Sequence, residues 1–218
     1  MGTRRQFVND LEELNNLIIE LAELSREALN DAMDALFHQN LDKAKQIIDN
    51  DYLIDRKELE INDKAILLIA KQQPVAMDLR RIIIALRIVT DLERMADNAK
   101  NIAKSALLLG KNYSAIPNDL KKMHEMITDM LQHAILAFVN EDTKIASKLA
   151  EMDDKVDKQY KLVVTELLGE TATNPDKIQY VMQVAFSARY LERYADHITN
   201  IGESILYLVK GENFNLNY

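Results

Sequence analysis

One fourteen-residue segment occurs twice in this chain, ninety-nine positions apart. LERMADNAKNIAKS runs from Leu92 to Ser105, and LERYADHITNIGES runs from Leu191 to Ser204. Eight positions are identical, and they are polar as well as apolar: Leu92/Leu191, Glu93/Glu192, Arg94/Arg193, Ala96/Ala195, Asp97/Asp196, Asn101/Asn200, Ile102/Ile201 and Ser105/Ser204. Since a repeat retained for packing alone would need only its apolar positions, the repeated polar residues indicate a shared chemical role.

The residues that begin and end helices repeat with a similar spacing. Pro74 and Pro175, like Gly110 and Gly211, are separated by 101 positions. Proline is favoured in the first turn of a helix and glycine just after the last. The chain has only 5 glycines and 3 prolines, and 48% of its residues are hydrophobic, which is typical of long helices joined by short connections.

Between these breaks, apolar residues recur at intervals of three and four, the spacing of amphipathic helices. The pattern predicts helices over residues 4–37, 41–71, 75–109, 117–139, 143–168 and 175–210, with a loop at 169–174. We therefore expect an all-α protein of six long helices, organised as a tandem repeat of two three-helix bundles in residues 1–112 and 113–218.

Each half carries two pairs of acidic residues spaced four apart, one pair on its second helix and one on its third. Residues four apart lie about 40° apart around a helix, so each pair forms a column, which an asparagine extends on the third helix. Like charges at this spacing oppose the helix by roughly 0.2–0.5 kcal/mol per pair, which suggests that a cation offsets them. The candidate ligands are Asp51, Asp55, Glu93, Asp97, Asn101, Asp153, Asp157, Glu192, Asp196 and Asn200.

Carboxylate and amide oxygens are hard donors, suited to Mg²⁺, Mn²⁺, Ca²⁺ or oxidised iron, and carboxylates on facing helices can bridge several ions. We expect the acids to border a buried face, because a stripe leads into each acidic column along its helix: Leu79, Ile83, Leu86 and Thr90 in the first half, and Ile178, Met182, Ala185 and Arg189 in the second. A different interpretation stays open, in which arginines of the chain pair with the acids and no metal binds.

A carboxylate-bridged metalloenzyme is the third interpretation, and the sequence disfavours it. No glutamate is followed three residues later by a histidine, as the di-iron bundles require. The four histidines do not pair with one another at ligand spacing, and only His197, next to Asp196, remains as a possible outer ligand. Phosphate-binding glycine loops and nucleophile motifs are also missing, so we expect a protein that is not an enzyme.

Charge and composition limit the kinds of partner that the protein is expected to bind. The net charge of −8 disfavours nucleic acid and anionic lipid surfaces, both of which attract basic proteins. Without cysteine there is no disulfide, thiolate zinc site or cysteine nucleophile. The sequence shows no signal peptide and no run of about 18 apolar residues, so we expect a cytoplasmic protein with no membrane insertion.

The sequence resembles the PhoU family over nearly its whole length. The resemblance lies in QPVAMDLR from Gln73 to Arg80, in the two LER-x-AD-x-x-x-NI segments, and in QYV followed by RYLER, which ends at Arg193. Two departures are Ala96 and Ala195, where many members have glycine. A third difference lies between the halves, where Asn98 stands opposite His197, and it suggests that the two sites are not equivalent.

The resemblance implies a function that composition alone does not. PhoU-like proteins are negative regulators of phosphate uptake and of the phosphate-starvation response, and they link the ATPase of a phosphate ABC transporter to a sensor histidine kinase. It also implies a homodimer, and a metal site at the acidic pairs that holds one or several divalent or trivalent ions of iron, manganese, zinc or magnesium.

Overall fold

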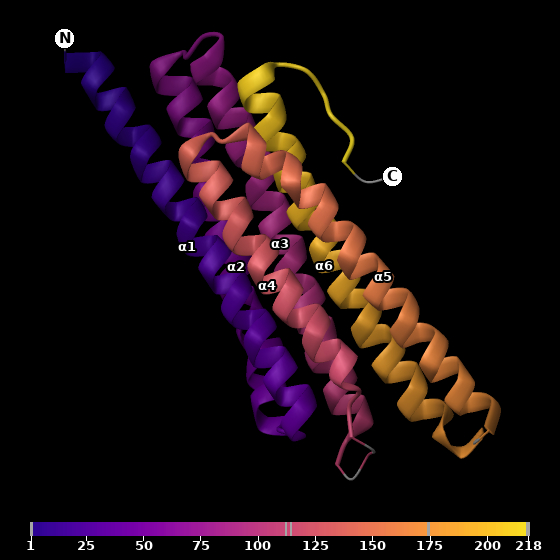
Figure 1. The fold of residues 1–218 in the computed structure, drawn as a ribbon. Helices are drawn as coiled ribbons and strands as arrows, with labels where there is room; N and C mark the ends of the chain where they lie inside the picture. The colour runs from indigo at the N-terminus through magenta and orange to yellow at the C-terminus, as the bar shows by residue number, and fades with distance from the viewer. Residues whose placement is uncertain (1, 112, 114, 174, 217–218) are drawn as a thin grey trace.

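The computed structural model describes residues 2–111, 113, 115–173 and 175–216, and these residues form six long helices joined by short connections (Figure 1). Within the described residues there is no strand. The expected all-α fold is confirmed. The elements are α1 (Gly2–His38), α2 (Leu41–Gln72), α3 (Met77–Leu109), α4 (Asn118–Asn140), α5 (Thr143–Thr173), the short 3₁₀ helix η1 (Pro175–Lys177) and α6 (Ile178–Lys210).

The first connection of each half is built in the same way. Gln39 and Glu141 both adopt a left-handed backbone, with φ of 56° and 48°. The next residue then caps the following helix: Asn40 Oδ1 accepts a hydrogen bond from the Lys43 amide at 3.0 Å, and Asp142 Oδ1 accepts from backbone amides at 2.8 and 3.2 Å. Side-chain capping of this kind supplies partners for amides that the first helical turn leaves unbonded. It lets α1/α2 and α4/α5 turn back tightly as antiparallel pairs.

The two bundles, α1–α3 and α4–α6, pack against each other mainly through α3 and α6, which form the most extensive helix pair. The buried hydrophobic residues of both halves belong to a single core. Its largest fully buried side chain is Tyr194 on α6, whose hydroxyl lies 2.9 Å from the Ser25 hydroxyl on α1. The core therefore runs through the boundary between the repeats.

Three predicted helix boundaries differ clearly from the structure. Helix α5 does not end at Leu168 but continues to Thr173, so the described part of the predicted loop is helical, while Asn174 lies outside the described residues. Gly169 is exposed within this helix, where glycine costs about 1 kcal/mol relative to alanine, and the buried Leu167 one turn after Val163 maintains the packing face. Helix α3 begins at Met77 rather than at 75. Helix α6 begins at Ile178 rather than at 175, because Pro175–Lys177 form the separate 3₁₀ helix η1.

Among the described helices, none combines the length and the unbroken apolar sequence that a bilayer crossing requires.

Candidate functional site

The structure brings the two acidic pairs of each half together, because the antiparallel neighbours α2/α3 and α5/α6 pack directly on each other. In the first half, Asp51 and Asp55 of α2 lie near enough to α3 for Asp55 to interact electrostatically with Asp97, and Glu93 with Asp55. The convergence of four carboxylates is therefore present in the first half.

The second half repeats this arrangement. Asp153 on α5 interacts electrostatically with Asp157 on its own helix and with Glu192 and Asp196 on α6. Figure 1 shows α5 and α6 running side by side along this part of the molecule. Each repeat thus presents four carboxylates across one helix pair, and we call these groups the first and second acidic clusters.

In the first acidic cluster, a lysine of the chain lies between the carboxylates. Lys100 Nζ donates to Asp51 Oδ2 on α2 and to Asp97 Oδ1 on α3, both at 2.5 Å. Burial opposes the charge on Lys100, but the two carboxylates outweigh this and raise its pKa above the usual value. Arg94 adds an ion pair to Asp97 Oδ2 at 3.2 Å. Asp51 and Asp97 are therefore paired within the chain, Asp97 by an arginine as one interpretation expects, and both by a lysine.

The surroundings of Glu93 in the first cluster disfavour its charged form. Burial raises its pKa from 4.5 to about 7, and the neighbouring carboxylate of Asp97 adds to this effect. Arg94 Nε lies 3.4 Å from Glu93 Oε2 and favours the charged form. Glu93 is thus balanced between neutral and charged forms near pH 7.

The second acidic cluster has two oxygen atoms without partners. Asp153 and Glu192 are each only 8% exposed, and among the described residues Asp153 Oδ1 and Glu192 Oε2 are the buried side-chain polar atoms that lack a hydrogen bond. Burial, followed by the charge of Asp196, raises the pKa of each to about 7. Arg189 pairs with the other oxygen of Glu192. Thr199, which occupies the position of Lys100, lies close enough to Asp153 to oppose part of this rise in pKa.

The two asparagines at the ends of the columns lie in other contacts. Asn101 Oδ1 accepts from Lys104 Nζ at 3.3 Å. Asn200 donates to Asp91 on α3 at 3.2 Å, and His197 Nδ1 lies 2.9 Å from the same carboxylate oxygen. His197 and Asn200 therefore join the second repeat to the first, a contact that the sequence analysis did not anticipate. As metal ligands, both asparagines remain predictions.

The expectation that the acids continue a buried face holds only for the apolar residues nearest the acids. Leu86 and Ala185 are partly buried against the core. The apolar residues farther from the acids are exposed: Leu79, Ile83, Ile178 and Met182. The acids are sheltered for another reason, since they face the neighbouring helix of their own bundle. Glu192 is buried where α5 covers α6, several turns away from these apolar side chains.

The chemistry of the clusters suits a hard cation, although their side chains are not yet gathered around one. Among the described residues, no three Asp, Glu or His side chains are close enough to one another to surround an ion as they stand. Oxygen donors fit Mg²⁺, Mn²⁺ or iron. The unpartnered oxygens of Asp153 and Glu192 are the acceptors that such a cation would satisfy.

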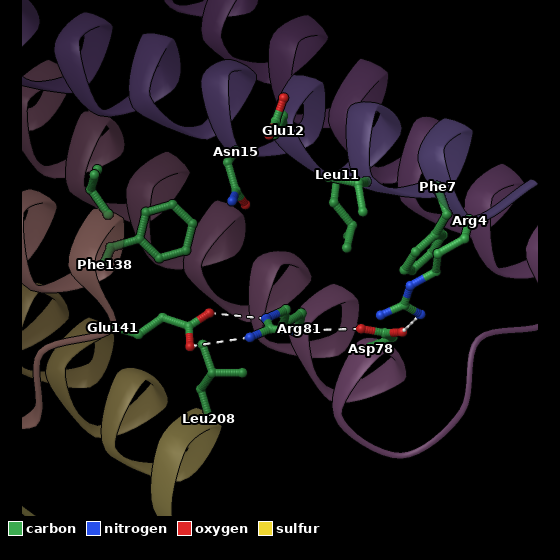
Figure 2. Close-up of a pocket in the computed structure, with 12 residues that line it drawn as sticks. Arg4, Phe7, Leu11, Glu12, Asn15, Asp78, Arg81, Phe138, Glu141 and Leu208 are labelled. Atoms are coloured by element: carbon green, nitrogen blue, oxygen red, sulfur yellow. Dashed lines mark hydrogen bonds and ion pairs between the residues drawn. The ribbon is translucent and has the colours of Figure 1, made fainter. Parts of the chain in front are cut away.

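A separate pocket of about 230 Å³ lies at the end of the molecule where the N-terminus of α1 meets α3, α4 and α6 (Figure 2). Arg81 Nε donates to Glu141 at 2.9 Å and pairs with Asp78 at 3.4 Å, while Arg4 pairs with Asp78 at 2.6 Å. Arg81 thus reaches from α3 to the connection between α4 and α5, and it does not contact the acidic clusters. Its contact with Glu141 joins the two repeats, whereas the contacts of Asp78 lie within the first repeat.

Comparison with known proteins agrees with this architecture. The model of the PhoU domain matches the chain twice, over residues 18–106 and 120–205. A phosphate-specific transport system accessory protein PhoU homolog of Clostridium acetobutylicum is 37% identical over 99% of both chains, and the PhoU accessory protein of Escherichia coli is 30% identical over 96% of this chain and 87% of its own length.

Solved structures give the same result. The crystal structure of the phosphate transport system regulatory protein PhoU from Streptococcus pneumoniae superposes with a TM-score of 0.89 at 31% identity, covering 96% of this chain and 99% of the other. PhoU from Pseudomonas aeruginosa superposes equally well, with 94% of this chain covered. With the duplicated three-helix bundle, the repeated acidic pairs and relatives over nearly its full length, this chain belongs to the PhoU family.

Proposed function

We propose that this chain is an accessory and regulatory protein of a phosphate transport system, and that it represses phosphate uptake and the phosphate-starvation response. One observation carries the proposal: relatives named as accessory or regulatory proteins of phosphate transport match the chain from end to end, in sequence and in fold. The protein acts without catalysis, as a helical adaptor in the cytoplasm that contacts the transporter ATPase and a sensor histidine kinase.

An adaptor of this kind works by differential binding. A ligand or partner shifts a conformational equilibrium only by the difference in its affinity for the two states, so the protein must hold one state of the ATPase or kinase more tightly than the other. Long helices supply the surface for this. Large exposed apolar side chains on α2, such as Leu59 and Leu67, support a surface that a partner or a second copy in a homodimer covers.

Metal ions bind among the repeated acidic residues in this proposal, and the bound metal is structural or sensory. Such an ion supplies positive charge between two neighbouring helices. The carboxylates of Asp153, Asp157, Glu192 and Asp196 would hold it in the second repeat, from α5 on one side and α6 on the other. Their mutual repulsion, together with the unpartnered oxygens of two of them, supports this role.

The regulatory role is tested by deleting the gene and measuring phosphate uptake and the expression of a phosphate-starvation reporter. Deletion is expected to leave the reporter active in high phosphate, and the intact gene is expected to restore repression. Purified protein should also retain the transporter ATPase or the kinase domain in a binding assay. Unchanged reporter and uptake, together with no binding of either partner, would overturn the proposal.

The metal is tested by elemental analysis of protein purified without a metal-affinity tag. The parent protein should carry iron, manganese, zinc or magnesium, and thermal unfolding should shift upward when the matching ion is added to the chelated protein. If no metal is present and none of these ions alters thermal unfolding, the metal-free scaffold remains, in which the regulator works through its protein surface alone.

A further inference from the structure

We propose that the two acidic clusters are not equivalent: Lys100 serves as the permanent cation of the first, so that the second alone takes a metal ion. This inference rests on the proposed metal binding. The two repeats supply corresponding sets of four carboxylates. At one of the positions where the repeated segments differ, the first repeat has Lys100 and the second has Thr199. The first cluster therefore has a charged ammonium group at the position where the second cluster has a neutral hydroxyl.

The position of Lys100 is that of a bridging cation. Its ammonium group donates to carboxylates of both helices, Asp51 on α2 and Asp97 on α3, at 2.5 Å each. These are the inter-helix carboxylates that a metal ion would have to share. An ion entering the first cluster would have to displace Lys100, would meet its positive charge at close range, and would leave a largely sheltered lysine without its partners.

In the described part of the chain, the second cluster has no lysine that bridges its two helices. Thr199 brings a neutral hydroxyl, which donates to the Ala195 carbonyl at 3.3 Å on its own helix. Asp153 and Glu192 are each 8% exposed, and each keeps one buried carboxylate oxygen without a partner. Buried acceptors are nearly always satisfied in folded proteins, so two such atoms in one cluster support the binding of a positively charged ligand there.

The arginines near the second cluster do not replace Lys100. Arg189 approaches along α6 itself and pairs with one oxygen of Glu192, three residues away. Arg193, the counterpart of Arg94, acts on Glu192 and Asp196 through its charge. Both lie on the same helix as the acids they affect, whereas Lys100 joins two helices. The α5/α6 pair is thus left for an ion to bridge.

The test is equilibrium dialysis of the chelated protein against Mn²⁺, with bound metal counted per chain and the environment followed by electron paramagnetic resonance. The variant Asp153→Asn/Glu192→Gln should lose the Mn²⁺ that the parent binds. The matched variant of the first repeat, Glu93→Gln/Asp97→Asn, should retain it. Circular dichroism in the presence of chelator confirms that each variant is folded, so that loss of metal is not loss of structure.

The decisive variant is Lys100→Thr, which copies the residue of the second repeat into the first. It should bind additional Mn²⁺ beyond the parent, and adding Asp51→Asn should remove that increment. The inference is overturned if both paired variants lose metal equally, or if Lys100→Thr binds no more than the parent. If no protein in the series binds Mn²⁺, iron, zinc or magnesium, the proposed metal binding fails as a whole, while the phosphate reporter still tests the regulatory role.

Discussion

Replacing Glu192 by glutamine should stabilise the metal-free protein at pH 8, although it removes a predicted metal ligand. Glu192 is 8% exposed, its Oε2 atom has no hydrogen-bond partner, and burial beside Asp196 raises its pKa from 4.5 to about 7. Glutamine has nearly the same shape and no charge. Its amide oxygen can still accept from Arg189, and its amide nitrogen can donate among the neighbouring carboxylates.

The expected size follows from the shift in pKa. Each unit corresponds to about 1.4 kcal/mol, so a rise from 4.5 to about 7 means that ionising Glu192 costs the folded state roughly 3 kcal/mol at pH 8. Residual contact with water screens part of this, and we expect Glu192→Gln to gain about 1–2 kcal/mol in free energy of unfolding.

The pH dependence of the stability difference tests whether the charge of Glu192 is the cause. The carboxyl group of Glu192 has a raised pKa in the folded state, so its contribution to stability is fully present below the unfolded value of 4.5 and is lost as the pH rises through about 7. The advantage of Glu192→Gln should therefore be large at pH 8 and mostly gone at pH 5. Urea unfolding in the presence of chelator, followed by circular dichroism, measures the free energy of unfolding of parent and variant at pH 8 and at pH 5.

The matched control is Asp97→Asn in the first repeat. Asp97 is paired with Lys100 at 2.5 Å and with Arg94 at 3.2 Å, so removing its charge should destabilise the protein by about 1–2 kcal/mol. Opposite signs for the two substitutions are expected. If Glu192→Gln is less stable than the parent at pH 8, or gains equally at pH 5, the carboxylate of Glu192 is not an uncompensated charge and the argument is refuted.

Further outcomes can be measured by the same unfolding assay or by hydrogen exchange. Gly202→Ala should destabilise by about 1–3 kcal/mol, because its Cβ would lie 2.9 Å from a side chain and 3.1 Å from a carbonyl oxygen of α5, whereas Gly169→Ala, with nothing within 4 Å, should stabilise by about 0.5–1 kcal/mol. Tyr194→Phe should cost about 1–2 kcal/mol by orphaning the Ser25 hydroxyl, and adding Ser25→Ala should cost less than the sum of the single changes. Burial lowers the pKa of His124, so stability should fall as the pH drops below 6.5, and His124→Gln should flatten that slope. Chelation should raise hydrogen exchange in α5 and α6 more than in α2 and α3.

Most of the fold could be predicted from the sequence because the signals that end helices are local. Pro74 and Gly110 act through their own backbone geometry, and their counterparts a repeat later mark the same boundaries. The end of α5 was mispredicted for a different reason. Gly169 resembles a helix terminator, but the burial of Leu167 against the core outweighs the small cost of an exposed glycine within the helix.

The acidic clusters could be predicted only in part. The spacing of Asp51 and Asp55, and of Glu93 and Asp97, specifies two columns, and short connections force the helices carrying them to pack side by side. The sequence does not predict the role of Lys100, because a lysine three residues after an aspartate is typical of an ordinary surface ion pair. Its contact with Asp51 depends on the register of α3 against α2, which the packing of both helices determines together.

The difference between Lys100 and Thr199 gives the two repeats different physical dependences. A lysine is part of the chain, so its stabilisation of the contact between α2 and α3 does not depend on the concentration of metal ions. A bound ion stabilises the folded state in proportion to the logarithm of its concentration relative to its dissociation constant. If only the second cluster takes an ion, the α5/α6 pair alone responds to the supply of metal, while α2 and α3 stay fixed. Because His197 and Asn200 of α6 hold Asp91 of α3, the responsive helix remains anchored to the fixed half.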